Sequence, residues 1–126
     1  MWRALSRPGR DAGRRRAAAR LLGNARTRES LIGPGARVSG TVERSVVGRG
    51  AVVEAGAVVR ESVLLPGAVV RSGAVVERAI LDDGVEIGRD GAVGEPGGEI
   101  ALVGLRASVP AGERLPAGAR HPDPDD

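Results

Sequence analysis

The sequence predicts an all-β fold, a left-handed parallel β-helix of about four to five coils, and three observations support this prediction. A block of 17 residues starts at Ser45, Ser62 and Ala79, and its first two copies agree at ten of 17 positions. Large aliphatic residues recur in steps of six, six and five. Opposite charges alternate from block to block. A unit this short can bury its apolar face only by stacking on further copies.

The composition limits the protein to one modest domain with a thin core. The 126 residues include one Trp and no Phe or Tyr, so Val, Ala, Leu and Ile must form the core. The absence of Cys excludes disulfides, cysteine-based zinc sites and thiol nucleophiles. No apolar run approaches the ~20 residues of a membrane span, and no secretory segment follows the basic start. We therefore expect a soluble, cytoplasmic protein without a membrane partner.

Residues 1–29 form a basic segment rich in Arg and Ala, which we expect to be a disordered arm or a short helix. Residues 1–30 hold nine Arg against Asp11 and Glu29, whereas residues 31–126 hold ten Arg against fourteen acidic residues. A tail for nucleic acid or anionic membranes is the alternative. Only Trp2 could stack on a base, so we expect no nucleic-acid partner.

Residues 30–120 carry the repeat and are predicted to form the β-helix. The large inward residues are Ile32, Val38, Val47, Val53, Val59, Leu64, Val70, Val76, Leu81, Ile87 and Val93. A second inward residue, usually small, follows four positions later: Ala51, Ala57, Val63, Ala68, Ala74, Ile80, Val85 and Gly91. Six residues make a short strand and a corner, and three such units close a triangular coil. Val favours strands, and Gly allows corners with positive φ.

The block at residues 30–44 is two residues shorter than the others. It aligns with the following block if the two residues are missing at Ser39-Gly40. We expect this trimmed block to form the first coil.

The charged residues test the register of the coils. In a 17-residue coil, each residue lies beside the residue 17 positions later, about 4.8 Å away. The predicted columns are Glu43–Arg60–Glu77, Arg44–Glu61–Arg78 and Glu54–Arg71. Neighbours in every column have opposite signs, which favours this register because stacked like charges would oppose it.

The end of the chain departs from the 17-residue spacing. The segment Gly94–Glu99 is predicted to be a loop, and Val103, Val109 and Leu115 then resume the step of six. We expect a last coil that covers the open end of the stack. Residues 121–126, HPDPDD, are predicted to be an acidic disordered tail.

The candidate chemical groups are few, and we predict no catalytic, cofactor-binding or metal-binding residue and no cofactor. Hexapeptide proteins include ones that resemble acyltransferases with a coil histidine as base, and others that resemble zinc enzymes with three histidines. The single histidine here, His121, falls in the predicted tail. Asp82, Asp83, Glu86 and Asp90 could bind a cation through oxygen ligands, but Asp-Asp-Gly is also a good turn sequence.

The segments SGTVERSVV (39–47), RESVLLPGAVV (60–70) and ERAILDDGVEIG (77–88) carry a family resemblance. They are similar to the C-terminal β-helix of ADP-glucose pyrophosphorylase, or glucose-1-phosphate adenylyltransferase, over roughly residues 31–120. Related sugar-nucleotide pyrophosphorylases have similar helices. The nucleotide-binding catalytic domain that precedes this helix in the family has no counterpart in the residues before Ser30.

The resemblance implies a non-catalytic assembly or regulatory module linked to glycogen or related α-glucan synthesis. Its expected partner is another copy of itself or a sugar-nucleotidyltransferase catalytic domain. By loose alignment, Arg106 lies where the family places a basic residue of its effector site. The chain could also be a detached part of the full enzyme. Two alternatives stay open: a stand-alone hexapeptide acyltransferase, and a structural β-helix protein that assembles with itself.

Overall fold

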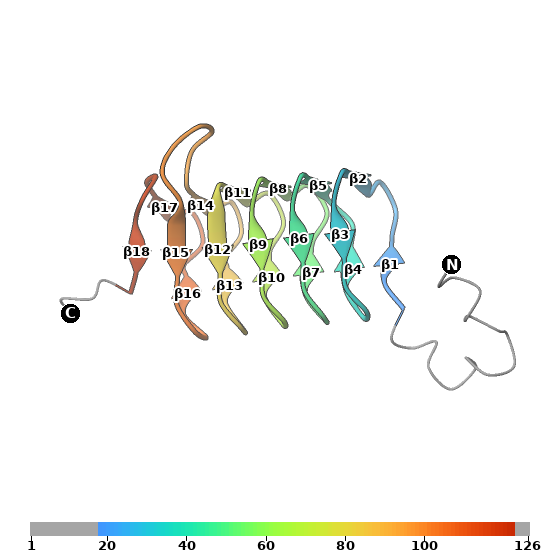
Figure 1. Cartoon of the computed structure of the whole chain (residues 1–126). Coiled ribbons are helices and arrows are strands. Elements are labelled where there is room, and N and C mark those ends of the chain that lie inside the picture. Colours follow the sequence, from blue (N-terminus) through green and yellow to red (C-terminus); the bar gives the residue numbers. More distant parts are fainter. Residues whose placement is uncertain (1–17, 123–126) are drawn as a thin grey trace, which may run out of the picture.

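The computed structural model describes residues 18–122, which form a parallel β-helix of six coils. Each coil gives one short strand to each of three six-stranded sheets, and the coils follow one another along the stack axis (Figure 1). The predicted all-β parallel β-helix is therefore confirmed. The predicted count of four to five coils was too low.

The three sheets are named here A, B and C. Sheet A contains β1 (Arg20–Leu21), β4 (Arg37–Val38), β7 (Val52–Val53), β10 (Val69–Val70), β13 (Glu86–Ile87) and β16 (Ser108–Val109). Sheet B contains β2 (Arg26–Arg28), β5 (Thr41–Glu43), β8 (Val58–Arg60), β11 (Val75–Glu77), β14 (Ala92–Val93) and β17 (Arg114–Leu115). Sheet C contains β3 (Leu31–Ile32), β6 (Val46–Val47), β9 (Val63–Leu64), β12 (Ala79–Leu81), β15 (Ala101–Val103) and β18 (Arg120–His121).

The strand register confirms both the 17-residue coil and the trimmed block. Val53 pairs with Val70, 17 residues later, and the same spacing joins Thr41 to Val58. Val38, by contrast, pairs with Val53, only 15 residues later. The two missing residues therefore fall between Val38 and Thr41, at the predicted Ser39-Gly40 position.

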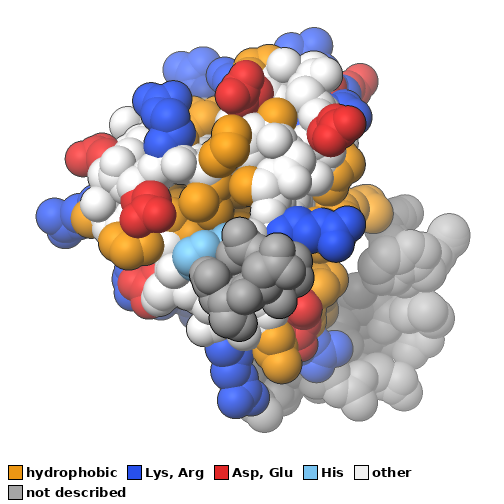
Figure 2. All heavy atoms as spheres, turned by 90° about the vertical axis from the view of Figure 1, so that its left-hand side faces the viewer, with side chains coloured by type: hydrophobic (Ala, Val, Ile, Leu, Met, Phe, Trp, Pro, Cys, Tyr) orange, Lys and Arg blue, Asp and Glu red, His pale blue; other side chains and the backbone are white. Residues whose placement is uncertain are grey.

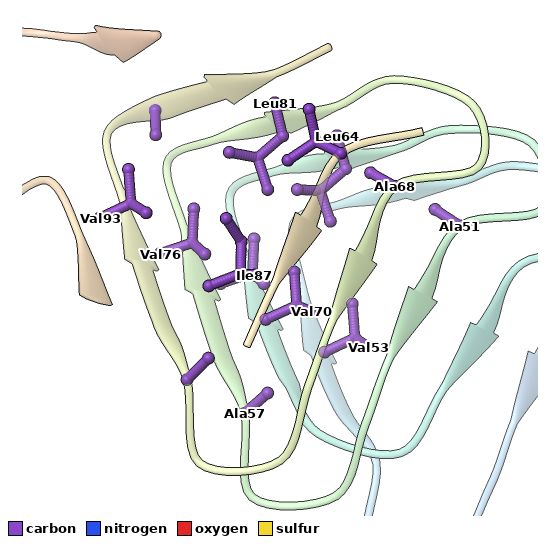
Figure 3. Close-up of a cluster of buried hydrophobic side chains, with 14 of the residues drawn as sticks. Ala51, Val53, Ala57, Leu64, Ala68, Val70, Val76, Leu81, Ile87 and Val93 are labelled. Carbon is purple, nitrogen blue, oxygen red and sulfur yellow. The ribbon is translucent and has the colours of Figure 1, made fainter. Parts of the chain in front are cut away.

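The core is a set of stacked aliphatic columns, as Figure 3 shows for Leu64 beneath Leu81 and for Val53, Val70 and Ile87. The predicted large inward residues from Val38 to Val93 are all buried, and Ile32 is partly buried against them. Side chains without aromatic rings thus fill the interior, which agrees with the composition.

The second set of inward residues was predicted correctly except on sheet C. Val63 is half-buried and Ile80 is 36% exposed, because both point outward, and Ser62 and Ala79 take the inward positions instead. The cause is the corner before the strand, where Glu61 and Arg78 have φ of 48° and 46°. This left-handed residue shortens the step from six residues to five and moves the next side chain inside.

A column of serines satisfies the backbone at this corner. The hydroxyl of Ser45 donates to the carbonyl oxygen of Glu43 at 2.7 Å and accepts from the amide of Ser62 at 3.0 Å. Ser62 repeats the pattern with the carbonyl of Arg60 and the amide of Ala79. Ser30 begins the column with the same two kinds of bond. Each buried hydroxyl therefore joins two successive coils.

The N-terminal boundary of the β-helix lies earlier than predicted. β1 and β2 fall within the segment expected to be a disordered arm or short helix, and they pair in parallel with β4 and β5. Leu21, Thr27 and Ile32 are spaced by six and five residues, the same steps that separate the inward residues of later coils, so the repeat already includes this segment. The pattern is hard to recognise in the sequence because Thr27 is polar and arginines surround it. The rest of the predicted arm, residues 1–17, lies outside the described residues.

The C-terminal boundary also differs from the prediction. The expected loop at Gly94–Glu99 is present between β14 and β15 and projects from one corner of the stack (Figure 1). His121, predicted to lie in the tail, pairs with Val103 in sheet C and is half-buried. It follows Leu115 by six residues, so it takes the next inward position. Residues 123–126 of the predicted tail lie outside the described residues.

Figure 2 looks onto the C-terminal end of the stack. Charged side chains lie around the rim of this face, and apolar side chains and the histidine are visible nearer its middle. Ile87, Val93 and Val103 of the preceding coil pair with the last coil and are fully buried. The last coil therefore covers the core of the coil before it.

Candidate interaction surface

Two of the three predicted charge columns lie on the corner between sheets B and C and on sheet B. Arg60 bridges the carboxylates of Glu43 at 3.2 Å and Glu77 at 3.0 Å. Glu61 likewise accepts from Arg44 at 3.2 Å and from Arg78 at 3.1 Å. Both columns are confirmed, and each links three successive coils. The guanidinium of Arg78, followed by that of Arg44, lowers the pKa of the Glu61 carboxyl below its usual value.

The third column is larger than the sequence indicates. Arg71 pairs with Glu54 at 2.8 Å, as predicted, and also with Glu86 at 2.8 Å. The carboxylate of Glu54 further accepts a bond from the amide of Ser72 at 3.0 Å. The hydrogen bond from Arg71, with further help from Ser72, lowers the pKa of Glu54. Contacts with Glu86 and then Glu54 raise the pKa of Arg71.

An aliphatic row runs along the outer face of sheet C. One outward residue from each of five successive coils belongs to it: Leu31, Val46, Val63, Ile80 and Leu102. Leu31 is 70% exposed, Val46 40%, Ile80 36% and Leu102 37%. We call these five residues the sheet C row.

The other two sheets carry no comparable row among residues 18–122. The outward positions of sheet A are apolar only at Val52 and Val69, between Arg37 and Glu86. Those of sheet B are apolar at Val58, Val75 and Ala92, which are half-buried beside the charged column around Arg60. The five-residue sheet C row is thus found on one face of the stack. The sequence prediction missed this row because it assigned Val63 and Ile80 to the interior.

The sequence-derived chemical candidates do not come together in one site. The Nε2 atom of His121 lies 3.0 Å from the carbonyl oxygen of Ser108. Glu86 of the acidic cluster faces Arg71, whereas the Asp82 carboxylate accepts from the amide of Asp83 at 2.7 Å. Within residues 18–122, no group of three or more acidic or histidine side chains is arranged to hold a metal ion.

Arg106 lies exposed at the corner between sheets C and A, with φ of 56°. Its amide donates to the carbonyl of Asp83 at 2.8 Å. Gly35, Gly50, Gly67 and Gly84 hold the same corner in the preceding coils, all with positive φ. Arg106 thus carries a side chain where the other coils have none.

Two open hollows lie near the N-terminal coils. The one of about 380 Å³ is lined by Leu22, Arg37, Ser39, Val52, Glu54, Ala55 and Ser72. The one of about 480 Å³ is lined by Ala25, Arg26, Thr27, Arg28 and Glu43. Every fully buried side-chain nitrogen or oxygen among residues 18–122 has a hydrogen-bond partner. Within the same residues, no helix is long and apolar enough to cross a membrane.

These features define a hexapeptide-repeat β-helix protein. The family described as GlmU-like, C-terminal hexapeptide matches residues 18–99, which is well over half of the chain. The chain belongs to this family. The match begins ahead of β1 and so includes the first coil that the sequence prediction assigned to the arm. No curated protein matches the chain.

Proposed function

We propose that this chain is a non-catalytic β-helix module whose role is assembly. The observation that carries this proposal is the sheet C row. Contiguous exposed apolar surface with a polar rim is typical of a protein–protein interaction site. Here the rim consists of the corner residues Arg44, Glu61 and Arg78.

The finer part of the proposal concerns the biological setting. The segments around Ser62–Leu64 and Ala79–Asp82 resemble the C-terminal β-helix of glucose-1-phosphate adenylyltransferase. Membership of a family described as a C-terminal hexapeptide module is compatible with that resemblance. On this basis we propose a cytoplasmic role in glycogen or α-glucan synthesis, with a second copy or a sugar-nucleotidyltransferase domain as partner.

Co-purification tests the assembly role. The full chain would be co-expressed with a tagged nucleotidyltransferase catalytic domain and, separately, with a differently tagged copy of itself. Recovery of either partner in a fixed ratio is the expected result, and its loss in an Ile80→Lys variant would place the contact on sheet C. If neither partner is recovered, the assembly role is wrong. Filaments in electron micrographs would instead favour a structural, self-assembling protein.

A hexapeptide acyltransferase is the second candidate, and the position of His121 favours testing it. Because its Nε2 atom faces a carbonyl oxygen, this nitrogen carries the proton in the neutral ring, and Nδ1 can accept one. The purified chain would be incubated with acetyl-CoA and a panel of amino sugars. Turnover that disappears in His121→Ala would overturn the non-catalytic proposal.

A further inference from the structure

We infer that the outer face of sheet C binds the same face of a second copy, with the two stacks running in opposite directions. This inference rests on the proposed assembly role and specifies its partner and orientation. The sheet C row supplies the apolar part of the contact. The charged corner beside the row decides the orientation.

The apolar part is self-complementary in shape. The row has one aliphatic side chain per coil, about 4.8 Å apart, on a face whose strands are short and equally spaced. Two such faces can pack with aligned strands at about 10 Å, as the sheets of a sandwich do. Leu31 and Leu102 mark the two ends of the row.

The charged part selects one of the possible orientations. Along the corner before the sheet C strands, the residues Glu29, Arg44, Glu61 and Arg78 alternate in sign. A two-fold axis parallel to the strands keeps the strand direction and reverses the stack direction. It therefore places this corner against the same corner of the second copy, with the order of the coils reversed. With the axis between two coils, every acidic residue then faces a basic one.

The axis position that satisfies both requirements lies between the coils of Val46 and Val63. It sets Val46 against Val63 of the second copy, and Leu31, the most exposed residue of the row, against its Ile80. Arg44 then faces Glu61 and Glu29 faces Arg78, so all four charged residues of the corner meet an opposite charge. Charge and apolar contact therefore agree on the same register.

A two-fold axis along the stack is less favourable. It would bring the corner before each sheet C strand against the corner after it. Arg44 would then meet the exposed Arg49 of the second copy at the same height, and two like charges would face one another. Only Arg78, which would meet Asp82 and Asp83, gains an opposite charge in that arrangement, whereas the antiparallel one pairs all four residues of the corner.

The size of the face predicts a weak, reversible dimer. Five coils extend over roughly 20 Å of the stack axis. Interfaces that bury less than about 1,200 Å² in total are mostly transient. We therefore expect dimers that form at micromolar or higher protein concentration and dissociate on dilution.

Sedimentation velocity of the full chain over a wide concentration range tests the contact. Ile80→Lys should weaken dimerisation at least tenfold, because it places a cation within the apolar row. Val69→Lys is the matched control, since Val69 is half-buried, points outward in the same coil and belongs to sheet A. It should leave the dimer unchanged. A wild-type chain that stays monomeric at all concentrations, or equal effects of the two variants, would overturn the inference.

Single-cysteine variants test the orientation, and the chain has no native Cys to interfere. In the antiparallel dimer the two copies of residue 63 are one coil apart, whereas those of residue 102 are five coils apart, roughly 24 Å along the axis. A short bis-maleimide should therefore link Val63→Cys and leave Leu102→Cys unlinked. Linking at both positions would mean parallel stacks, and no linking of Val63→Cys would mean another face; either result contradicts the inference.

The two proposals fail in different ways. A monomeric chain that still captures a nucleotidyltransferase domain would remove the antiparallel dimer and leave the assembly role intact. Acetyl-CoA turnover dependent on His121 would remove the non-catalytic role, whatever the oligomeric state.

Discussion

The hydroxyl of Ser62 accepts a hydrogen bond from the backbone amide of Ala79 at 3.1 Å, one step along the stack. The same hydroxyl donates to the carbonyl of Arg60 at 2.7 Å, and Ser62 is only 3% exposed. In the first four coils a residue with a left-handed φ precedes the sheet C strand and turns the next side chain inward. The polar group is therefore buried because it replaces a backbone partner that this tight corner does not provide.

Ser62→Ala should lower the free energy of unfolding by about 1–3 kcal/mol, because the buried amide of Ala79 loses its acceptor. Urea unfolding followed by circular dichroism measures the change. Ser108→Ala is the control, since Ser108 is exposed and only its backbone carbonyl faces another side chain. An unfolding free energy equal to that of the wild type would show that water or another group replaces the hydroxyl.

Val70→Asp should unfold the stack or destabilise it by several kcal/mol, since an unpaired carboxylate would replace a fully buried side chain. Val52→Asp changes an outward residue of the same sheet that lies beside Arg37, and it should be tolerated. Thermal melts of both variants measure the difference. Similar stability of the two variants would mean that the inward and outward assignments on sheet A are wrong.

Arg106→Gly should raise the free energy of unfolding by about 1 kcal/mol, because a left-handed backbone is strained for any residue with a Cβ atom. Gly67→Ala makes the reverse change at the equivalent corner, where φ is 76° and no atom lies closer than 3.8 Å to a built Cβ. It should lower stability by a similar amount. A destabilised Arg106→Gly would show that the arginine side chain contributes contacts that outweigh the strain.

Stability should fall as the pH falls below about 4.3, the usual pKa of a glutamate in an unfolded chain. The pKa values of Glu54 and Glu61 are lowered in the folded chain, so the unfolded chain binds protons more readily. Their contribution is present at neutral pH and is lost as the pH drops through the lowered values. Melting temperatures from pH 7 to pH 3 test this expectation. In a Glu54→Gln, Glu61→Gln double variant the curve should be flatter, and an unchanged slope would mean that other carboxylates control the response.

The sequence predicted a side chain's position correctly wherever the coil length alone sets that position. The step of six identifies Val53, Val70 and Ile87 as one column, and the alternating signs of Glu43, Arg60 and Glu77 match their ion pairs. Both patterns depend only on the coil length. The predicted boundaries of the β-helix failed where a polar residue takes an inward position of the repeat. Thr27 does so in the first coil, and His121 does so in the last.

The sequence alone determined the fold, the coil length and the alternating charge columns, because a repeated unit must pack against its own copies. Only the tertiary structure decided which side chains on sheet C face outward. A positive φ at Glu61 and Arg78 shortens the corner by one residue, and that change turns the side chain directly after it inward and the following side chain outward. It buries Ser62 and exposes Ile80, so the backbone conformation of one corner residue creates both the serine column and the apolar row.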